Sequence, residues 1–354
     1  MSGNRVGRAT AGVVALGTVG LAVGLLAGGC GGPAAPSVRV EPEVTFALPP
    51  ATAGCDAATT LPGGAVRVPM TVSTVAGQVA ELVNVCIDGR GPYPFVLDSG
   101  AGQSTVGAGL ARRLHLPVAG QSTVFAGVGC TGTAQPVSVA AWSLEGVGLA
   151  PQELTSATLP QIGGRHEPVG LLGSDVLARF GGVRVDFDAG VLVLPGPEGA
   201  PLASSEPYTG PVGPPPDPVL TQGGGGTTVP LTVQPQQGDV SLNVEVRFAG
   251  GPRHRFVVDT GSSQSVVATS AARAASLKST DLAQRQATVC SVITVPLVHS
   301  GPWSVPGQRL YPQLVGETDL GASLGGTQGL LGSDQLKRYG WVVLDFTGAR
   351  MVLG

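Results

Sequence analysis

Charged and aromatic side chains are both scarce in this sequence. Charged residues make up 12% and aromatic residues 4% of the 354 residues, and the formal net charge is only -3. The chain has no run of lysine and arginine, so it lacks the electrostatic footprint of a nucleic-acid-binding protein. It is not a disordered chain either, because disorder requires low hydrophobicity together with high net charge, and 42% of the residues are hydrophobic.

Metal-binding patterns are missing as well. None of the five cysteines forms a Cys-x-x-Cys pair, and the four histidines show no ligand spacing, so no metal site is expected. No cofactor of another kind is expected either. Outside the cytoplasm, the four cysteines after Cys30 can form two disulfides, with three possible connectivities. They are Cys55, Cys86, Cys130 and Cys290.

Glycine and proline, in contrast, are abundant, with 56 and 30 residues. Such a composition disfavours long helices and favours short strands joined by turns. The length exceeds what one hydrophobic core usually holds, so two domains are expected.

The beginning of the chain is typical of an export signal. Arg5 and Arg8 precede an uncharged stretch over residues 9–29, and small residues lead into Cys30. We interpret residues 1–29 as the signal and Cys30 as the lipidated first residue of a membrane lipoprotein. Plain secretion or a single-span anchor are the alternatives, and all three place the remainder outside the cytoplasm.

The rest of the chain contains an internal duplication. FVLDSGAGQSTV at residues 95–106 recurs as FVVDTGSSQSVV at 256–267, and the GLLGSD segment beginning at Gly170 recurs at Gly329. The constant order and spacing predict two equivalent lobes. A tether rich in proline, alanine and threonine precedes them, and a Pro/Gly-rich linker separates them. The predicted boundaries are 30–66 for the tether, 67–195 and 228–354 for the lobes, and 196–227 for the linker.

Each lobe is expected to be mostly β. Alternating and β-branched runs predict strands at residues 82–87 and 183–187, and at 242–248 and 342–346 in the second lobe. A single short helix is expected near the end of each lobe, at 174–180 and 333–339. Ser174 and Ser333 are the predicted N-caps, and the aspartates that follow them are interpreted as structural.

Two Asp-Ser/Thr-Gly triplets contain the candidate catalytic residues. Asp98-Ser99-Gly100 and Asp259-Thr260-Gly261 each follow an apolar strand, which would deliver the aspartate to a strand end. The glycine permits a close backbone approach that a Cβ would obstruct. A single triplet of this kind is common in turns. Two triplets at equivalent places in a duplication can bring their aspartates together across a pseudo-twofold axis.

With these motifs the chain resembles the pepsin-like and retropepsin-like aspartic proteases. The resemblance covers residues 77–194 and 229–353, and the local sequence of the motifs is closer to that of bacterial retropepsin-like proteins than to that of digestive pepsins. The apolar-apolar-Gly segments that support the catalytic loops in that family match Leu171-Leu172-Gly173 and Leu330-Leu331-Gly332. The implied fold is a two-lobed acid-protease β-barrel fold with pseudo-twofold duplication.

The implied activity is that of an aspartic endopeptidase. Asp98 and Asp259 would share one proton and activate a water against the peptide bond of an extended substrate. The duplication favours a monomer with an intramolecular pair over lobes that pair between chains. The alternative function is that of an inactive surface binding protein with the same fold.

The flap that covers the substrate in this family is harder to locate. We predict it at Gly127, Val128 and Gly129, a glycine-rich stretch that has the mobility of a lid but is equally consistent with an ordinary hairpin turn. No tyrosine lies there, unlike in pepsins. The second-lobe counterpart, residues 287–291, contains no glycine and is interpreted as a plain strand. A Cys130–Cys290 bond would tether the flap to the other lobe.

Overall fold

The computed structural model describes residues 38–41, 54–61, 64–160, 168–195, 220, 225–236, 239–320 and 325–354. The predicted export signal, Cys30 and nearly all of the predicted linker lie outside these ranges. Within them, no helix is both long and apolar enough to span a bilayer.

The first lobe is built almost entirely of strands. Its strands are β3 (Val66–Val75), β4 (Gln78–Ile87), β5 (Arg90–Asp98), β6 (Thr105–Gly107), β7 (Thr123–Gly127), β8 (Cys130–Val139), β9 (Trp142–Leu144), β10 (Val147–Leu149), β11 (Gln152–Ala157), β12 (Gly170–Gly173), β13 (Gly182–Asp186) and β14 (Val191–Leu194). Its α-helices are α1 (Ala108–Leu114) and α2 (Ser174–Leu177), and a 3-10 turn (Ala178–Phe180) extends α2.

The second lobe repeats this order. Its strands are β15 (Thr227–Pro230), β16 (Thr232–Gln236), β17 (Asp239–Phe248), β18 (Arg253–Asp259), β19 (Val266–Ala268), β20 (Lys278–Ala287), β21 (Val292–His299), β22 (Trp303–Val305), β23 (Gln308–Leu310), β24 (Leu314–Thr318), β25 (Gly329–Gly332), β26 (Trp341–Asp345) and β27 (Arg350–Leu353). Its α-helices are α3 (Thr269–Ala274) and α4 (Ser333–Leu336), with a 3-10 turn (Lys337–Tyr339) after α4.

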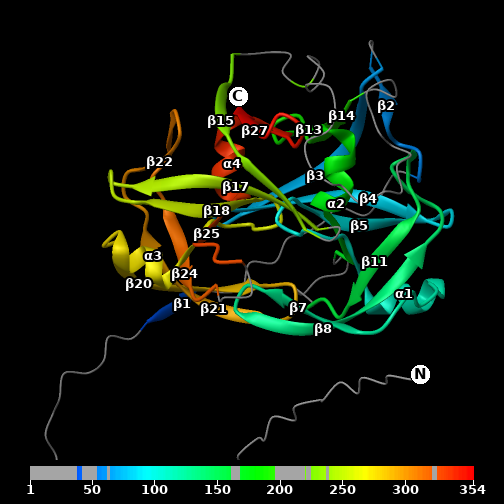
Figure 1. Cartoon of the computed structure of the whole chain (residues 1–354), viewed down its shortest axis with the longest axis horizontal. Coiled ribbons are helices and arrows are strands. Elements are labelled where there is room, and N and C mark those ends of the chain that lie inside the picture. The colour runs from blue at the N-terminus through cyan, green and yellow to red at the C-terminus, as the bar shows by residue number, and fades with distance from the viewer. Residues whose placement is uncertain are drawn as a thin grey trace, which may run out of the picture. The chain divides into compact units, whose positions relative to one another are not determined.

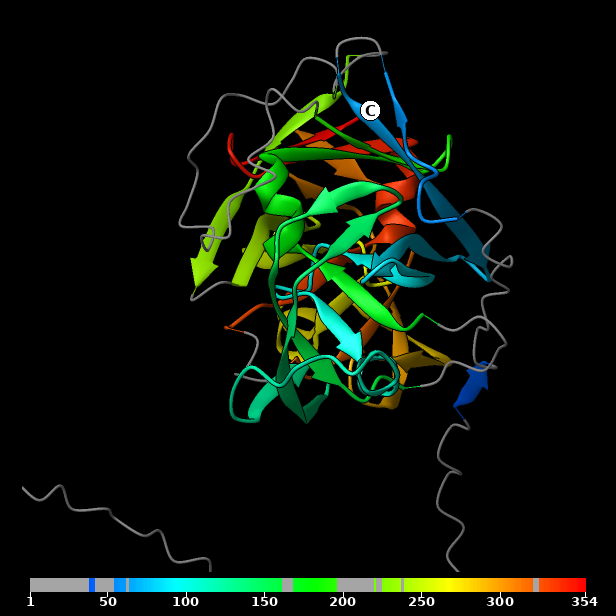
Figure 2. The ribbon, with the colours of Figure 1, turned by 90° about the vertical axis from the view of Figure 1, so that its right-hand side faces the viewer.

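The expectation of a mostly β, internally duplicated fold is confirmed. The helix predicted near the end of each lobe is α2 in the first lobe and α4 in the second. Each lobe also contains a helix that the sequence did not indicate, α1 or α3, directly after β6 or β19. Figure 1 shows the first lobe on the right and the second on the left, and Figure 2 brings the first lobe to the front.

One antiparallel sheet joins the lobes, in the order β15-β27-β26-β13-β14-β3. At its centre β13 pairs with β26, and Arg184 lies opposite Val343. These two residues are equivalent in the duplication, so the local twofold axis passes between them. Figure 1 shows this sheet at the top of the lobes.

Matched aromatic residues fill the core of each lobe. Phe95 on β5 and Phe256 on β18 are both fully buried. Each ring lies against the backbone of a glycine on the neighbouring parallel strand, Gly170 or Gly329, where a Cβ would collide with the ring. The glycine that begins each GLLGSD segment is therefore required for packing.

Parts of the predicted tether pair with the lobes. β1 (Arg39–Glu41) lies parallel to β20, and β2 (Thr59–Thr60) lies antiparallel to β3. Cys55 forms a disulfide with Cys86 on β4. The sequence predicts a flexible tether over residues 30–66, and these short segments of it are held against the lobes.

Candidate active site

Two parallel strand pairs bring the two aspartates to the middle of the molecule. β5 ends at Asp98 and pairs with β12, so that Gly173 lies beside Asp98. In the second lobe, β18 ends at Asp259 and pairs with β25, which places Gly332 beside Asp259. Leu172 and Leu331, one residue earlier, are fully buried and anchor the two strands in their cores.

The turns after the aspartates face one another across the lobes. A Cβ on Gly100 would collide with the carboxylate of Asp259, and a Cβ on Gly261 would collide with that of Asp98. Each glycine thus makes room for the carboxylate of the opposite lobe. Glycine at the third position of the triplets is required by this approach.

The hydroxyls at the second position of the triplets lock the two turns together. The backbone N–H of Ser99 donates to Thr260 Oγ1 at 2.9 Å, and the N–H of Thr260 donates to Ser99 Oγ at 3.1 Å. Ser99 Oγ donates to the carbonyl of Val258 at 2.8 Å, and Thr260 Oγ1 donates to that of Leu97 at 2.7 Å. Because both hydroxyls are buried, these four bonds fix the separation of the two loops.

The two carboxylates form a coupled pair. Asp98 Oδ1 accepts from the N–H groups of Gly100 and Ala101, at 3.0 and 2.8 Å, and Asp259 Oδ1 accepts from Ser262 N at 2.9 Å. Burial raises the pKa of Asp98. Burial, and then the negative charge of Asp98, raise the pKa of Asp259 well above its ordinary value. The side chains also share a hydrogen bond, so the two carboxyl groups titrate as a pair, and loss of a proton from one opposes loss of a proton from the other.

A second layer of matched residues supports the loops from behind. Ser104 donates through Oγ to Asp175 Oδ1 at 2.7 Å, and Ser265 donates to Asp334 Oδ1 at the same distance. Each serine oxygen also accepts from the glycine beside the triplet, at 2.9 Å from Gly173 N in the first lobe and 3.0 Å from Gly332 N in the second. The sequence favours a structural role for the two aspartates, but no local pattern reveals this network.

Ser174 and Ser333 do not cap their helices, contrary to the prediction. The N-cap residues are Gly173 and Gly332, and neither helix has a side-chain cap. Instead, Ser174 Oγ donates to the carbonyl of Ser99 at 2.7 Å, and Ser333 Oγ donates to that of Thr260 at 3.0 Å. The serines therefore support the loops of the two triplets, a role that local sequence does not reveal.

One buried carboxyl group breaks the symmetry of this layer. Glu81 on β4 is fully buried, and its Oε2 lies within hydrogen-bond distance of Ser333 Oγ, at 2.9 Å. Its other oxygen has no hydrogen-bond partner among the described residues, and burial raises the pKa of Glu81 to about 8. The equivalent residue in the second lobe is Leu242. A glutamate inside the apolar run QVAELVNVCI was the available sequence signal for this site.

The predicted flap is a hairpin. Gly127 ends β7, Val128 and Gly129 form the turn, and Gly129 adopts a positive φ of 65°. The counterpart at residues 287–291 is also a hairpin turn, between β20 and β21, so its interpretation as a plain strand was wrong. Thr288 makes this turn without glycine, because its Oγ1 accepts from Ser291 N at 3.1 Å and donates to Ser291 O at 3.0 Å.

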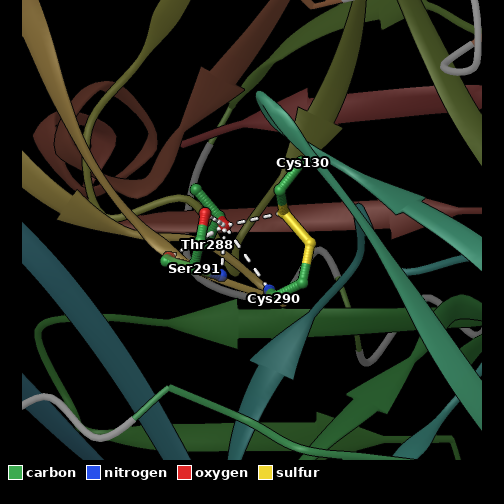
Figure 3. The surroundings of a disulfide bond; sticks show 4 residues. All are labelled: Cys130, Thr288, Cys290 and Ser291. Atoms are coloured by element: carbon green, nitrogen blue, oxygen red, sulfur yellow. Dashed lines mark hydrogen bonds between the residues drawn. A yellow bond between two sulfur atoms is a disulfide. The ribbon is translucent and has the colours of Figure 1, made fainter. Parts of the chain in front are cut away.

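The two hairpins are cross-linked. Cys130, the first residue of β8, forms a disulfide with Cys290 in the opposite turn, and Cys130 Sγ lies 3.1 Å from Thr288 Oγ1 (Figure 3). With Cys55–Cys86, this bond selects one of the three connectivities that the sequence left open. Figure 1 shows β7, β8 and β21 together, on the opposite side of β18 and β25 from the sheet that joins the lobes.

A match to one protein-family model agrees with this duplicated arrangement. The family model described as aspartyl protease matches residues 83–176 and 244–335, which together are more than half of the chain. The crystal structure of the aspartic proteinase from Irpex lacteus aligns with 82% of this chain and 97% of its own, with 15% identity and a TM-score of 0.46. No curated protein sequence matches the chain.

Proposed function

Because the chain belongs to the aspartyl protease family, we propose that it is an active endopeptidase with Asp98 and Asp259 as its catalytic pair. Family membership implies a hydrolase that acts on a peptide or protein. The finer proposal, that these two carboxylates cleave internal peptide bonds, is supported by their reciprocal placement. Each one lies against the glycine of the opposite triplet, and the pKa of each is raised.

The proposed reaction uses the single proton that the pair shares. The ionised carboxylate takes a proton from a water molecule as the water oxygen attacks the peptide carbonyl carbon. The protonated carboxyl donates its proton to the carbonyl oxygen, which gives a neutral tetrahedral intermediate. When the C–N bond breaks, the protonated carboxyl donates its proton to the leaving amine while the ionised carboxylate takes one from a hydroxyl of the intermediate, which becomes the new carboxyl group, so the pair again holds one proton. We assign the two roles to the pair and not to one residue each, because coupled groups titrate together.

The buried hydrogen bonds between Ser99 and Thr260 support this proposal. Catalysis by two carboxylates requires that their separation stay fixed while the charge moves from one to the other. Bonds between the two backbone turns satisfy this requirement without placing any side chain between the acids.

The test is cleavage of a mixed peptide library by the full-length protein, purified in detergent, between about pH 3 and pH 7. Asp98→Asn and Asp259→Asn are expected to abolish cleavage while the circular dichroism spectrum is unchanged. Asp88→Asn is the matched control, because Asp88 is exposed and lies outside the pair. Cleavage that survives in both variants would refute the assignment, and a folded protein without any cleavage would favour a binding protein.

We also propose that the enzyme acts outside the cytoplasm as a monomeric lipoprotein anchored through Cys30. The basic and apolar composition of residues 1–29 supports export, and the origin of both aspartates in one chain supports an intramolecular pair. Incorporation of labelled fatty acid that is lost in Cys30→Ser would test the anchor. Light scattering of the purified protein would test the monomer.

A further inference from the structure

The two hairpin tips cannot separate while the disulfide is intact. Cys130 and Cys290 are 160 residues apart and come from different lobes. The tips also pack closely. Gly127 lies against the Val289 side chain, and a Cβ added to Gly129 would lie 3.3 Å from the Ile293 side chain. In an enzyme whose lids close over the substrate, the lids must part for a chain to enter sideways. Here a covalent bond opposes that movement (Figure 3).

The disulfide closes a ring of polypeptide that includes the catalytic pair. The ring runs along residues 98–130, crosses the disulfide, and returns along residues 290–259. Between the two aspartates it is closed by the buried bonds of Ser99 and Thr260. Every link is therefore a covalent bond or a buried hydrogen bond.

The pair is not accessible from behind the ring. Ser174 and Ser333, which lie behind the two loops, are fully buried. Helices α2 and α4, which begin at these serines, lie on the same side of β18 and β25 as the sheet that joins the lobes, and the hairpins lie on the opposite side (Figure 1). Asp98 is partly exposed and Asp259 is 9% exposed, which leaves the hairpin side as the open side of the pair. An extended substrate with residues on both sides of the scissile bond must then pass through the ring.

We propose that the substrates are polypeptides with a free, unfolded end that threads through this ring. This inference rests on the proposed endopeptidase function and narrows its substrate class. Loops whose two ends both enter folded domains are excluded, because a folded domain is too bulky to thread and the hairpins cannot part to admit the loop from the side. The disulfide thus restricts the substrates to polypeptides that have a free end.

The test compares two substrates that contain the same cleavable sequence. In the open substrate a long flexible segment with this sequence follows one stable, disulfide-bonded domain and ends freely. In the blocked substrate a second copy of the domain is placed at the free end. The oxidised wild-type protein is expected to cleave the open substrate and to lose cleavage of the blocked one.

Two double variants identify the cause of this discrimination. Replacement of Cys130 and Cys290 by serine opens the ring and is expected to restore cleavage of the blocked substrate. Replacement of Cys55 and Cys86 by serine removes the other disulfide, leaves the ring closed, and should preserve the discrimination. Equal cleavage of both substrates by the wild type would overturn the threading proposal and leave the proposed activity standing.

The remaining outcomes are also decisive. If the opened variant cleaves the open substrate but not the blocked one, the ring is not the cause and the proposal is wrong. If the opened variant does not fold, the wild-type comparison alone still refutes or supports threading. Absence of cleavage of the open substrate by the wild type would refute the proposed activity and this inference together.

Discussion

Glu81 allows a quantitative test of how the second layer works. The side chain is fully buried, its pKa is raised to about 8 by burial, and one of its oxygens has no partner among the described residues. Glutamine has nearly the same shape, and its amide can still form a hydrogen bond with Ser333 Oγ. The substitution Glu81→Gln therefore removes the ionisation while it keeps the hydrogen bond.

The expected effect on stability depends on pH. The pKa is about 8 in the folded protein against an ordinary value of 4.5, so the folded state holds the proton more tightly than the unfolded chain. The stabilisation is fully present below pH 4.5 and is lost as the pH rises through 8. At about 1.4 kcal/mol per pH unit, ionisation of the unfolded chain lowers the free energy of unfolding by about 1 kcal/mol at pH 5 and about 3 kcal/mol at pH 7.

The measurement is urea unfolding of the wild type and Glu81→Gln at pH 5 and pH 7, followed by tryptophan fluorescence. Between these pH values, the wild type should lose about 2 kcal/mol more than the variant. Glu153→Gln is the matched control, because Glu153 is exposed, and it should follow the wild type. If the wild type and Glu81→Gln show the same pH dependence, Glu81 is not protonated in the folded protein and the reasoning is refuted.

Three further predictions concern the loops of the two triplets. The raised pKa values of Asp98 and Asp259 should keep one proton on the pair at a pH where an ordinary aspartate is already ionised. The value of kcat/KM should therefore decline only at a higher pH than the ordinary aspartate pKa. A decline at the ordinary pKa would contradict the coupling of the two carboxyl groups. Thr260→Val should cost about 2 to 4 kcal/mol in unfolding free energy through its two lost hydrogen bonds and should lower kcat, whereas Thr260→Ser should retain both quantities. Gly173→Ala places a Cβ 2.8 Å from a backbone oxygen and should cost about 3 kcal/mol or more in a urea titration, whereas Gly148→Ala, which has open space, should be neutral.

The duplication made most of the site predictable. Because the offset between equivalent residues near the triplets is constant, the repeat alone identifies Asp98 and Asp259 as equivalent residues, and likewise Ser99 and Thr260. Alternation and β-branching indicated the strands that carry them. The same offset relates Gln152 to Gln313, which donate to Asp175 and Asp334 at 2.9 and 2.7 Å, so the support of the second layer was within reach of the repeat.

Short helices and turns were less predictable. The helices α1 and α3 have no side-chain cap at their first turn, so they lack the usual start signal. The turn at residues 287–291 contains no glycine and forms through the Thr288 side chain. In both cases the local sequence permits several conformations, and contacts with the rest of the lobe select one.

The all-β class, the two lobes and the two acidic triplets follow from the amino-acid sequence, because periodicity, repetition and the conformational freedom of glycine are local properties. How the lobes engage follows only from the tertiary structure. The pairing of Cys130 with Cys290, the bonds between Ser99 and Thr260 and the burial of Glu81 against Ser333 all join residues more than 150 positions apart. Such contacts depend on how the two sheets are placed in space, and no local pattern encodes that placement.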